Sequence, residues 1–264
     1  DAMCKKFWVA HPESIKTQDF EMDGIPVRVY TPENAGKRAI LFTHGGGFVL
    51  GSLDSHDDVC AELAAATGTE VWASHYRLSP EHIYPAALDD VEAVWRRLTL
   101  DRREAVVVGD SAGARLSAAL CLRMRRLDGP MPIAQILIYP TLGGSATLPS
   151  FIENANAPML TAADMNNFDV LYKGDYQDGK DPELSPLQAQ EFSGLPPAYV
   201  VTADIDPLRD EGSTYVDKLR KAGVKAQWKN EPQLVHGYLR ARHSSQRAHD
   251  SFSGIVEKLQ TFLV

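Results

Sequence analysis

A serine between glycines has the surroundings that nucleophilic catalysis requires. GDSAG at 109–113 fits the pattern G-x-S-x-G, directly after the apolar run AVVV and directly before an Ala- and Leu-rich stretch. A sharp strand-to-helix turn of this kind presents the middle hydroxyl at the carboxyl end of a sheet, where the dipole of the following helix favours developing negative charge. The alternative is a glycine turn whose serine only caps the helix. We predict that Ser111 is a nucleophile.

A serine hydroxyl needs a base, and the base needs a third group to orient it. After a turn of this kind the expected chain order is serine, acid, histidine. Of the eight histidines, only His236, His243 and His249 follow the candidate acids. His236 stands in PQLVHGY at a predicted loop, and we predict that it is the base. The other two fall in a predicted polar helix with Arg240, Arg242 and Arg247, and we interpret these two histidines as solvated.

The acid is sought after the last but one predicted strand, in AYVVTADIDPLRDEG. This stretch offers Asp204, Asp206, Asp210 and Glu211. The last two fall in the first turn of a predicted helix, where acids favour the dipole for structural reasons. Pro207 suits the start of that helix, so Asp206 reads either as the triad acid or as a simple N-cap. We favour Asp206 as the acid, with Asp204 as the runner-up.

A glycine run explains how an oxyanion would be stabilised. HGGGF at 44–48 follows the apolar run AILFT, and glycines without a Cβ let backbone N–H groups approach a substrate. We predict Gly45, Gly46 and Ala112 as the oxyanion donors, with His44 structural and Phe48 packed. A phosphate loop is the competing interpretation, but the run lacks the Lys-Ser/Thr of a P-loop and the G-x-G-x-x-G of a dinucleotide site.

Short apolar runs alternate with helical patterns along most of the chain, which predicts an α/β fold with a mostly parallel, doubly wound sheet. FEM and PVRVYTP, joined by DGIP, predict a hairpin near the start. The further predicted strands are AILFT, EVWAS, AVVVGD, AQILIYP, AYVVTAD and VKAQWKN. Helices are predicted near 55–67, 86–98, 112–127, 207–222 and 237–250, with a last one at the end of the chain.

Residues 146–191 interrupt this alternation, because they are rich in Asn and Asp and contain no convincing strand. A long insertion in a compact domain is usually a lid or a binding element. We therefore predict a cap insertion at 146–191 on a catalytic domain made of 1–145 and 192–264.

Composition disfavours several other classes of protein. A net charge of −8 over 264 residues, with only short basic clusters such as RMRR at 123–126, disfavours a nucleic-acid binder, and we interpret those clusters as solvated helix faces and ends. Three separated cysteines without a CxxC pair argue against a disulfide framework or a zinc site. No apolar run is long enough for a signal peptide or a membrane span. We expect no cofactor and no metal, a cytoplasmic location, and a homodimer through an edge strand or the last helices as a further possibility.

Taken together, these motifs resemble those of the hormone-sensitive-lipase family of α/β-hydrolase esterases. The matching pieces are HGGGF at 44–48, YRLSPEHIYPAALDD at 76–90, GDSAGA at 109–114, DPLRDEG at 206–212 and HGY at 236–238. The resemblance implies Ser111 as nucleophile, Asp206 as acid and His236 as base, with Gly45, Gly46 and Ala112 as the oxyanion hole. It also implies hydrolysis of short- to medium-chain acyl esters without a cofactor.

Three further expectations accompany the resemblance. Arg77 and Glu81 are expected to form a buried ion pair that braces the loop beside the site, and Asp110 is expected to stabilise the turn at Ser111. Family members carry a helical segment well before the HGGG motif, which here begins at residue 44. The cap is therefore expected to come mainly from 146–191, which leaves a more open site.

A serine carboxylesterase with a small-molecule ester substrate is the function that we predict. An amidase or a carbohydrate deacetylase with the same triad is the first alternative, because the same residues attack either bond. A non-catalytic ligand receptor on this fold is the second, and the presence of His236 argues against it.

Overall fold

The structure is a computed structural model that describes residues 6–100, 103–178 and 180–264. Its centre is one eight-stranded sheet with the order β1-β2-β4-β3-β5-β6-β7-β8. The strands are β1 (Ile15–Met22), β2 (Ile25–Pro32), β3 (Ala39–Thr43), β4 (Glu70–Ser74), β5 (Ala105–Asp110), β6 (Ala134–Ile138), β7 (Ala198–Ile205) and β8 (Ala226–Val235). From β4 to β8 all neighbours are parallel, and β1 and β2 are antiparallel. The predicted α/β-hydrolase architecture is confirmed.

The hairpin forms where the turn sequence predicts it. Asp23 and Gly24 both have positive φ, at 50° and 84°, which is the backbone that Asp-Gly turns adopt between strands. Its first strand is longer than the FEM segment predicts. It begins at Ile15 because β1 pairs with β2 along its whole length, from Ile15 opposite Pro32 to Met22 opposite Ile25. Cross-strand pairing thus extends the strand to polar residues before FEM that the sequence pattern does not predict as strand.

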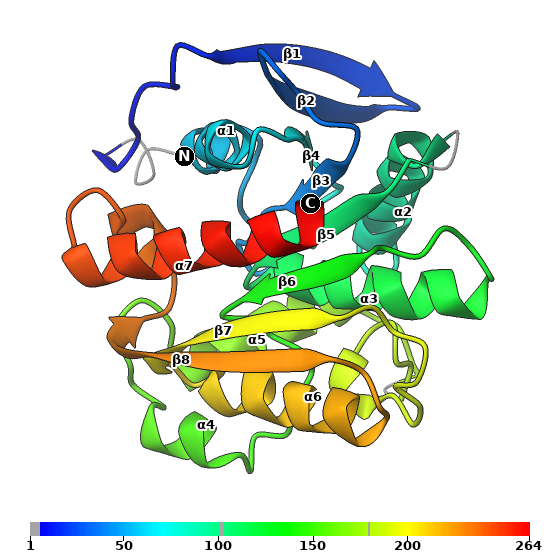
Figure 1. Cartoon of the computed structure of the whole chain (residues 1–264). Coiled ribbons are helices and arrows are strands. Elements are labelled where there is room, and N and C mark those ends of the chain that lie inside the picture. The colour runs from blue at the N-terminus through cyan, green and yellow to red at the C-terminus, as the bar shows by residue number, and fades with distance from the viewer. Residues whose placement is uncertain (1–5, 101–102, 179) are drawn as a thin grey trace.

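Helices cover both faces of the sheet (Figure 1). On one face lie α2 (Ala86–Leu98), α3 (Ala112–Arg126) and α6 (Arg209–Lys221), whose apolar sides pack in one core cluster with alternate strand residues. On the other face lie α1 (Asp57–Thr67) and α7 (Gln246–Leu263). Strands β3, β5 and β6 are buried at every position, which is why they read as continuous apolar runs.

The segment between β6 and β7 contains the two short helices α4 (Pro149–Glu153) and α5 (Ala162–Lys173) and a 3-10 turn at Pro186–Gln188. Among its described residues it contains no strand. Helix α5 starts at a capping box in which Thr161 and Asp164 satisfy each other's backbone N–H groups. Its function as a cap stays a prediction, but the local sequence explains why a helix begins here.

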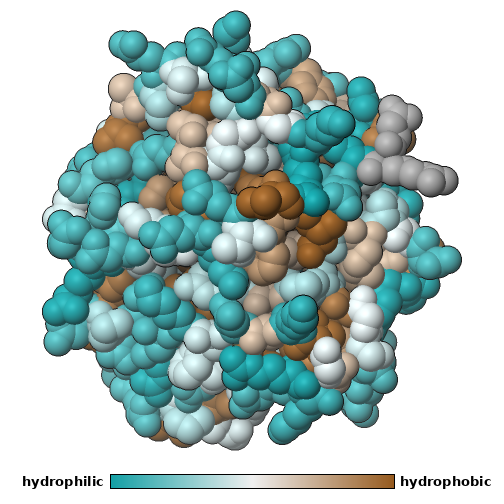
Figure 2. Space-filling view, in the orientation of Figure 1, coloured by the Kyte–Doolittle hydropathy of each residue, from teal (hydrophilic) through white to brown (hydrophobic). Residues whose placement is uncertain are grey.

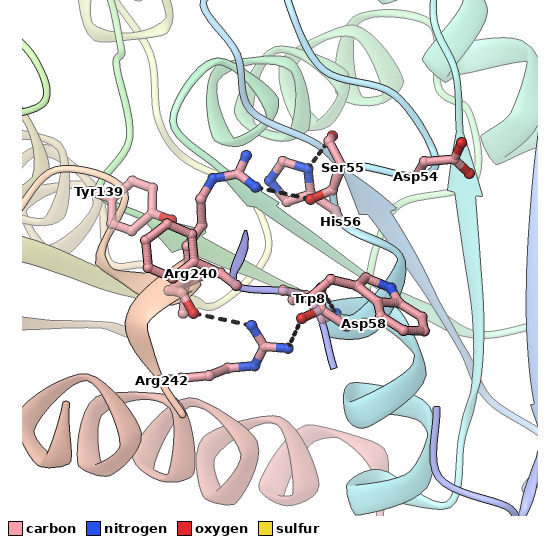
Figure 3. A pocket seen from close by; sticks show the side chains of 11 residues that line it. Trp8, Asp54, Ser55, His56, Asp58, Tyr139, Arg240 and Arg242 are labelled. Carbon is pink, nitrogen blue, oxygen red and sulfur yellow. Dashed lines mark hydrogen bonds and ion pairs between the residues drawn. The ribbon is translucent and has the colours of Figure 1, made fainter. Parts of the chain in front are cut away.

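The predicted helix at 237–250 is wrong in its boundaries. Residues Tyr238–Ala241 form a 3-10 turn, and α7 begins only at Gln246 and continues to Leu263. Between them Arg242 turns inward, with a side chain only 1% exposed, and binds Asp58 at 2.6 Å (Figure 3). It also binds Glu62 at 2.7 Å. The polar helix pattern does not show that Arg242 is buried; two carboxylates of α1 compensate its charge.

Two charged residues differ from expectation. Arg77 does not pair with Glu81, which is exposed, but binds the buried carboxylate of Asp90 at 2.7 Å. Arg123, expected on a solvated face, is buried and binds Glu183 at 2.7 Å. On the face seen in Figure 2, polar side chains predominate and apolar residues form scattered patches.

Candidate active site

Ser111 lies at the sharp turn between β5 and α3. Its φ of 53° and ψ of −119° belong to a conformation that a non-glycine residue rarely adopts and that is found at functional sites. Gly109 and Gly113 make the turn feasible: a Cβ on Gly109 would clash with the carbonyl of Gly113, and one on Gly113 with the carbonyl of Thr43. The Ser111 side chain forms no capping bond with the helix, so the interpretation as a simple N-cap is not supported.

A continuous line of hydrogen bonds joins the serine to a histidine and an aspartate. His236 Nε2 is 2.9 Å from Ser111 Oγ, and His236 Nδ1 is 2.7 Å from Asp206 Oδ2. The three side chains follow β5, β7 and β8, whose carboxyl ends meet at one edge of the parallel sheet. Gly237, with φ at 72°, turns the chain directly after His236. This arrangement can take the hydroxyl proton of Ser111 and stabilise the imidazolium that results.

Of the two readings that the sequence left open for Asp206, the N-cap is not supported, because the N-cap of α6 is Leu208. Asp206 is fully buried, and its Oδ1 accepts the N–H of Leu208 at 2.9 Å while its other oxygen contacts His236. The runner-up Asp204 instead accepts from the Asn230 side chain at 2.9 Å, and within the described residues it makes no hydrogen bond to His236. The structure brings Asp206, and not Asp204, to the histidine.

The glycine loop contradicts one predicted donor. The N–H of Gly45 donates to Asp110 Oδ1 at 2.8 Å and is therefore not free to meet an oxyanion. Within the part of the chain that the structure describes, the N–H groups of Gly46, Gly47 and Ala112 have no hydrogen-bond acceptor. The sequence cannot distinguish these consecutive glycines, because the choice depends on where the Asp110 carboxylate lies.

Asp110 connects the turn at Ser111 to the glycine loop. Its carboxylate lies 3.1 Å from His56 Nε2 and 3.3 Å from the hydroxyl of Tyr139, besides the bond from Gly45. Burial opposes its ionisation, but His56 outweighs this and holds the pKa of Asp110 well below its usual range. A fixed negative charge here draws the first glycine of the loop against β5.

His44 packs behind the same loop. Burial lowers its pKa to about 3, so its imidazole is neutral at ordinary pH. The ring stacks on Tyr76 with centroids 4.3 Å apart, and Nδ1 contacts the carbonyl of Gly45 at 2.8 Å. These contacts agree with the prediction of a structural residue.

Ser111 and His236 open into a cavity of about 180 Å³. Its apolar wall comes mainly from two segments far apart in the chain: Phe48 and Leu50 of the glycine loop, and Met159, Leu160, Met165 and Phe168 of the 146–191 segment. Polar residues such as Tyr139, Thr141, Asp169 and Arg240 also line it. A neighbouring small pocket shares Tyr139 and Arg240 and lies toward α1 (Figure 3).

Comparison with known proteins places the chain among the α/β hydrolases. Residues 40–240 match the family model described as alpha/beta hydrolase fold. Esterase LipI of Mycobacterium tuberculosis is 38% identical over 245 residues, which cover 87% of this chain and 76% of the relative. Ethyl acetate hydrolase of Pseudomonas putida is 36% identical over 254 residues, which cover 90% and 79%. A solved esterase of the bacterial hormone-sensitive lipase family superposes with a TM-score of 0.92 at 27% identity, over all of this chain and 89% of that one.

The chain belongs to the hormone-sensitive-lipase family of α/β-hydrolase esterases. It is a carboxylic ester hydrolase. In the described residues of this esterase, no group of three or more His, Cys, Asp or Glu side chains is placed to hold a metal ion. None of the helices there is long and apolar enough to cross a membrane.

Sequence reasoning missed most of the cavity wall of this esterase. Met159, Leu160, Met165 and Phe168 carry no motif, and their only signal was that they lie in the insertion at 146–191. The sequence places Arg240 only in a polar helix, whereas it lines the cavity and donates to the carbonyl of Ser55 at 3.0 Å. A wall is a property of side chains that meet in space, so no spacing along the chain reveals it.

Proposed function

We propose that this esterase hydrolyses short- to medium-chain acyl esters through an acyl-enzyme on Ser111. The observation that carries the proposal is the pair of hydrogen bonds from Ser111 Oγ to His236 and from His236 to the buried Asp206, at 2.9 Å and 2.7 Å. Ser111 and His236 both line the cavity of about 180 Å³, and Asp206 lies buried behind His236.

In the first step His236 Nε2 takes the proton of Ser111 while Oγ attacks the ester carbonyl carbon. The carbonyl π-bond becomes an oxyanion, and Asp206 holds the imidazolium in place. The tetrahedral adduct collapses with cleavage of the bond to the alcohol oxygen, which receives the proton from His236. Water then repeats the sequence on the acyl-serine: His236 takes its proton, the carboxylic acid leaves and Ser111 recovers its hydrogen.

The oxyanion forms against the N–H groups of Gly46, Gly47 and Ala112 in this proposal. Support comes from their lack of any other acceptor among the described residues and from the glycines' place in the cavity wall. Gly45 contributes indirectly, because its bond to Asp110 draws the loop toward Ser111. Each preorganised donor of this kind contributes about two to three orders of magnitude in rate.

Chain-length preference follows from the cavity. A volume of about 180 Å³ with an apolar lining suits an acyl group of a few carbons, whereas a long chain would extend past the exposed Leu50 and Met159 into solvent. The relative named ethyl acetate hydrolase supports a short acyl group.

Initial rates on p-nitrophenyl acetate, butyrate, octanoate and palmitate test the proposal, with Ser111→Ala measured alongside. We expect rates that are highest on acetate or butyrate and a loss of at least about 10⁴-fold in the variant. Retained activity in Ser111→Ala would refute the serine mechanism. Activity on matched anilides or acetylated sugars without activity on esters would favour the amidase or deacetylase, and binding without turnover would favour a receptor.

A further inference from the structure

The loop that carries the proposed oxyanion donors adopts an unfavourable backbone. Gly46, Gly47 and Phe48 have φ of 127°, 63° and 65° in succession. Glycine accepts such angles, but Phe48 carries a Cβ, and the left-handed region costs a non-glycine residue about 1–3 kcal/mol. Such a conformation persists only where surrounding contacts hold it. Something outside the loop must therefore stabilise Phe48.

An aromatic ring of α5 supplies that contact. Tyr172 stacks on Phe48 with ring centroids 3.6 Å apart and planes 8° from parallel. Both side chains are about 1% exposed, and the guanidinium of Arg115 lies 5.5 Å and 5.6 Å from the two ring centroids. A buried aromatic pair with a cation beside both rings favours one orientation of Phe48.

Helix α5 also reaches the neighbouring glycine. A Cβ on Gly47 would lie 2.5 Å from the ring of Phe168, so this ring packs directly on the bare backbone of the loop. Two residues of α5, four apart and thus on one face of the helix, contact two consecutive residues of the loop. The face of α5 that lines the cavity is the same face that supports the donors.

The position of α5 is itself fixed to the catalytic helix. Arg115, one turn after Ser111 in α3, binds Asp169 of α5 at 2.7 Å and donates to the carbonyl of Leu184 at 2.6 Å. Its side chain is only 3% exposed, so these bonds hold a buried charge. Nucleophile, loop and α5 are thus connected through one arginine.

We propose that Tyr172 is a positioning residue for the oxyanion loop: its ring holds Phe48 in the left-handed conformation that directs the Gly46 and Gly47 N–H groups at the reacting carbonyl. The 146–191 segment then contributes to catalysis as well as to the wall of the cavity. This inference rests on the serine mechanism proposed above.

Tyr172→Leu removes the ring and keeps an apolar side chain. If the donors are displaced, the transition state loses more stabilisation than the bound ester does. We therefore expect kcat to fall about 10- to 100-fold while KM changes less than about threefold. Affinity for a trifluoromethyl ketone, which forms a tetrahedral oxyanion with the serine, should fall by the same factor as kcat/KM. Affinity for the corresponding secondary alcohol should stay within about twofold.

Two companion variants separate positioning from general damage. Tyr172→Phe keeps the ring and should restore kcat to within about threefold of the original value. Tyr176→Leu makes the same change just beyond α5, where Tyr176 contacts Tyr84 and not the loop, and should leave kcat within about twofold. All rates are taken at least 10 °C below each variant's own melting midpoint.

Phe48→Leu removes the other ring of the same stack. If Tyr172→Leu does not fold, the same measurements are made on Phe48→Leu. Because the two rings form one interaction, the double variant should lose little more than the larger single loss. Full additivity would overturn the inference, and so would a Tyr172→Leu enzyme with unchanged kcat, or one whose affinities for ketone and alcohol fall equally. Ser111→Ala in the same assays tests the underlying mechanism separately. An active Ser111→Ala would refute the serine mechanism. An inactive Ser111→Ala together with a fully active Tyr172→Leu would refute only the inference about Tyr172.

Discussion

At the scale of single residues, the site depends on which atom of a residue faces which partner. Asp206 and Asp204 lie two positions apart at the end of β7, yet only Asp206 reaches His236. Likewise Gly45 and Gly47 are chemically identical, yet only one has its N–H bound to Asp110. Substitutions at these neighbours therefore distinguish the proposed roles.

Asp206→Asn should reduce kcat by about 10³- to 10⁴-fold, because the amide no longer stabilises the imidazolium or selects the tautomer that accepts the serine proton. Asp204→Asn is the matched control. Its carboxylate contacts Asn230 and the N–H of Gln233, so kcat should stay within about threefold. Steady-state rates on p-nitrophenyl butyrate decide between the two, and a larger loss in Asp204→Asn would reverse the assignment of the acid.

Gly47→Ala should reduce kcat at least about 10²-fold, because the added methyl meets the ring of Phe168 and displaces the loop. Gly68→Ala places the same strain elsewhere: its φ of 61° nearly equals the 63° of Gly47, but a Cβ there meets nothing within 4 Å. That control should lose about 1 kcal/mol of stability and no activity. Equal kcat in the two variants would show that Gly47 is not near the reacting carbonyl.

At the scale of elements, buried arginines connect segments that are distant in sequence. Arg242 joins the segment before α7 to Asp58 and Glu62 of α1, and Arg115 joins α3 to α5. Each bond compensates a buried charge that would otherwise be costly. These contacts fix the layer of helices against which the catalytic loops rest.

Arg242→Met should lower the free energy of unfolding by about 3–5 kcal/mol, because it leaves two carboxylates of α1 without their partner. Arg247→Met, in the exposed part of α7, should change it by less than about 0.5 kcal/mol. Urea unfolding followed by circular dichroism gives both values. Similar small losses in the two variants would show that the side chain of Arg242 is solvated.

At the scale of the whole molecule, stability should depend on the ionisation of one buried acid. Glu211 is buried beneath the loop after β6 and accepts the N–H of Leu142. Burial raises its pKa to about 7, although this N–H and Arg115 partly offset the effect. Since the unfolded chain has the ordinary lower pKa, the folded state holds the proton more tightly.

This proton linkage has a definite sign. The contribution of Glu211 to stability is fully present below its unfolded pKa of about 4.3 and is lost as the pH rises through the folded value. Between pH 4.5 and pH 8 the loss amounts to about 2–4 kcal/mol. The glutamine of Glu211→Gln does not titrate. Between the two pH values, the free energy of unfolding of this variant, measured in urea, should therefore fall by about 2–4 kcal/mol less than that of the original protein. Parallel curves for the two proteins would contradict the raised pKa.

Local sequence determined much of this protein. The turn at Ser111 and the strand runs follow from residues close together in the chain, because glycine spacing and apolar periodicity act on the backbone within a few residues. The α/β-hydrolase family follows from several such short motifs in a fixed order along the chain. The choice of Asp206 over Asp204 came from the resemblance of DPLRDEG at 206–212 to the family motif. The sequence was sufficient where the chemistry depends on neighbours along the chain.

Only the tertiary structure decided which groups meet across the molecule. The partner of Arg77 is Asp90 and not Glu81, Arg242 is buried against α1, and Gly45 is bound by Asp110. The stack of Tyr172 on Phe48 joins residues 124 positions apart. A charged group or an N–H group binds the partner that the packed elements bring within about 3 Å. That distance depends on the relative placement of strands and helices, and no short stretch of sequence determines this placement.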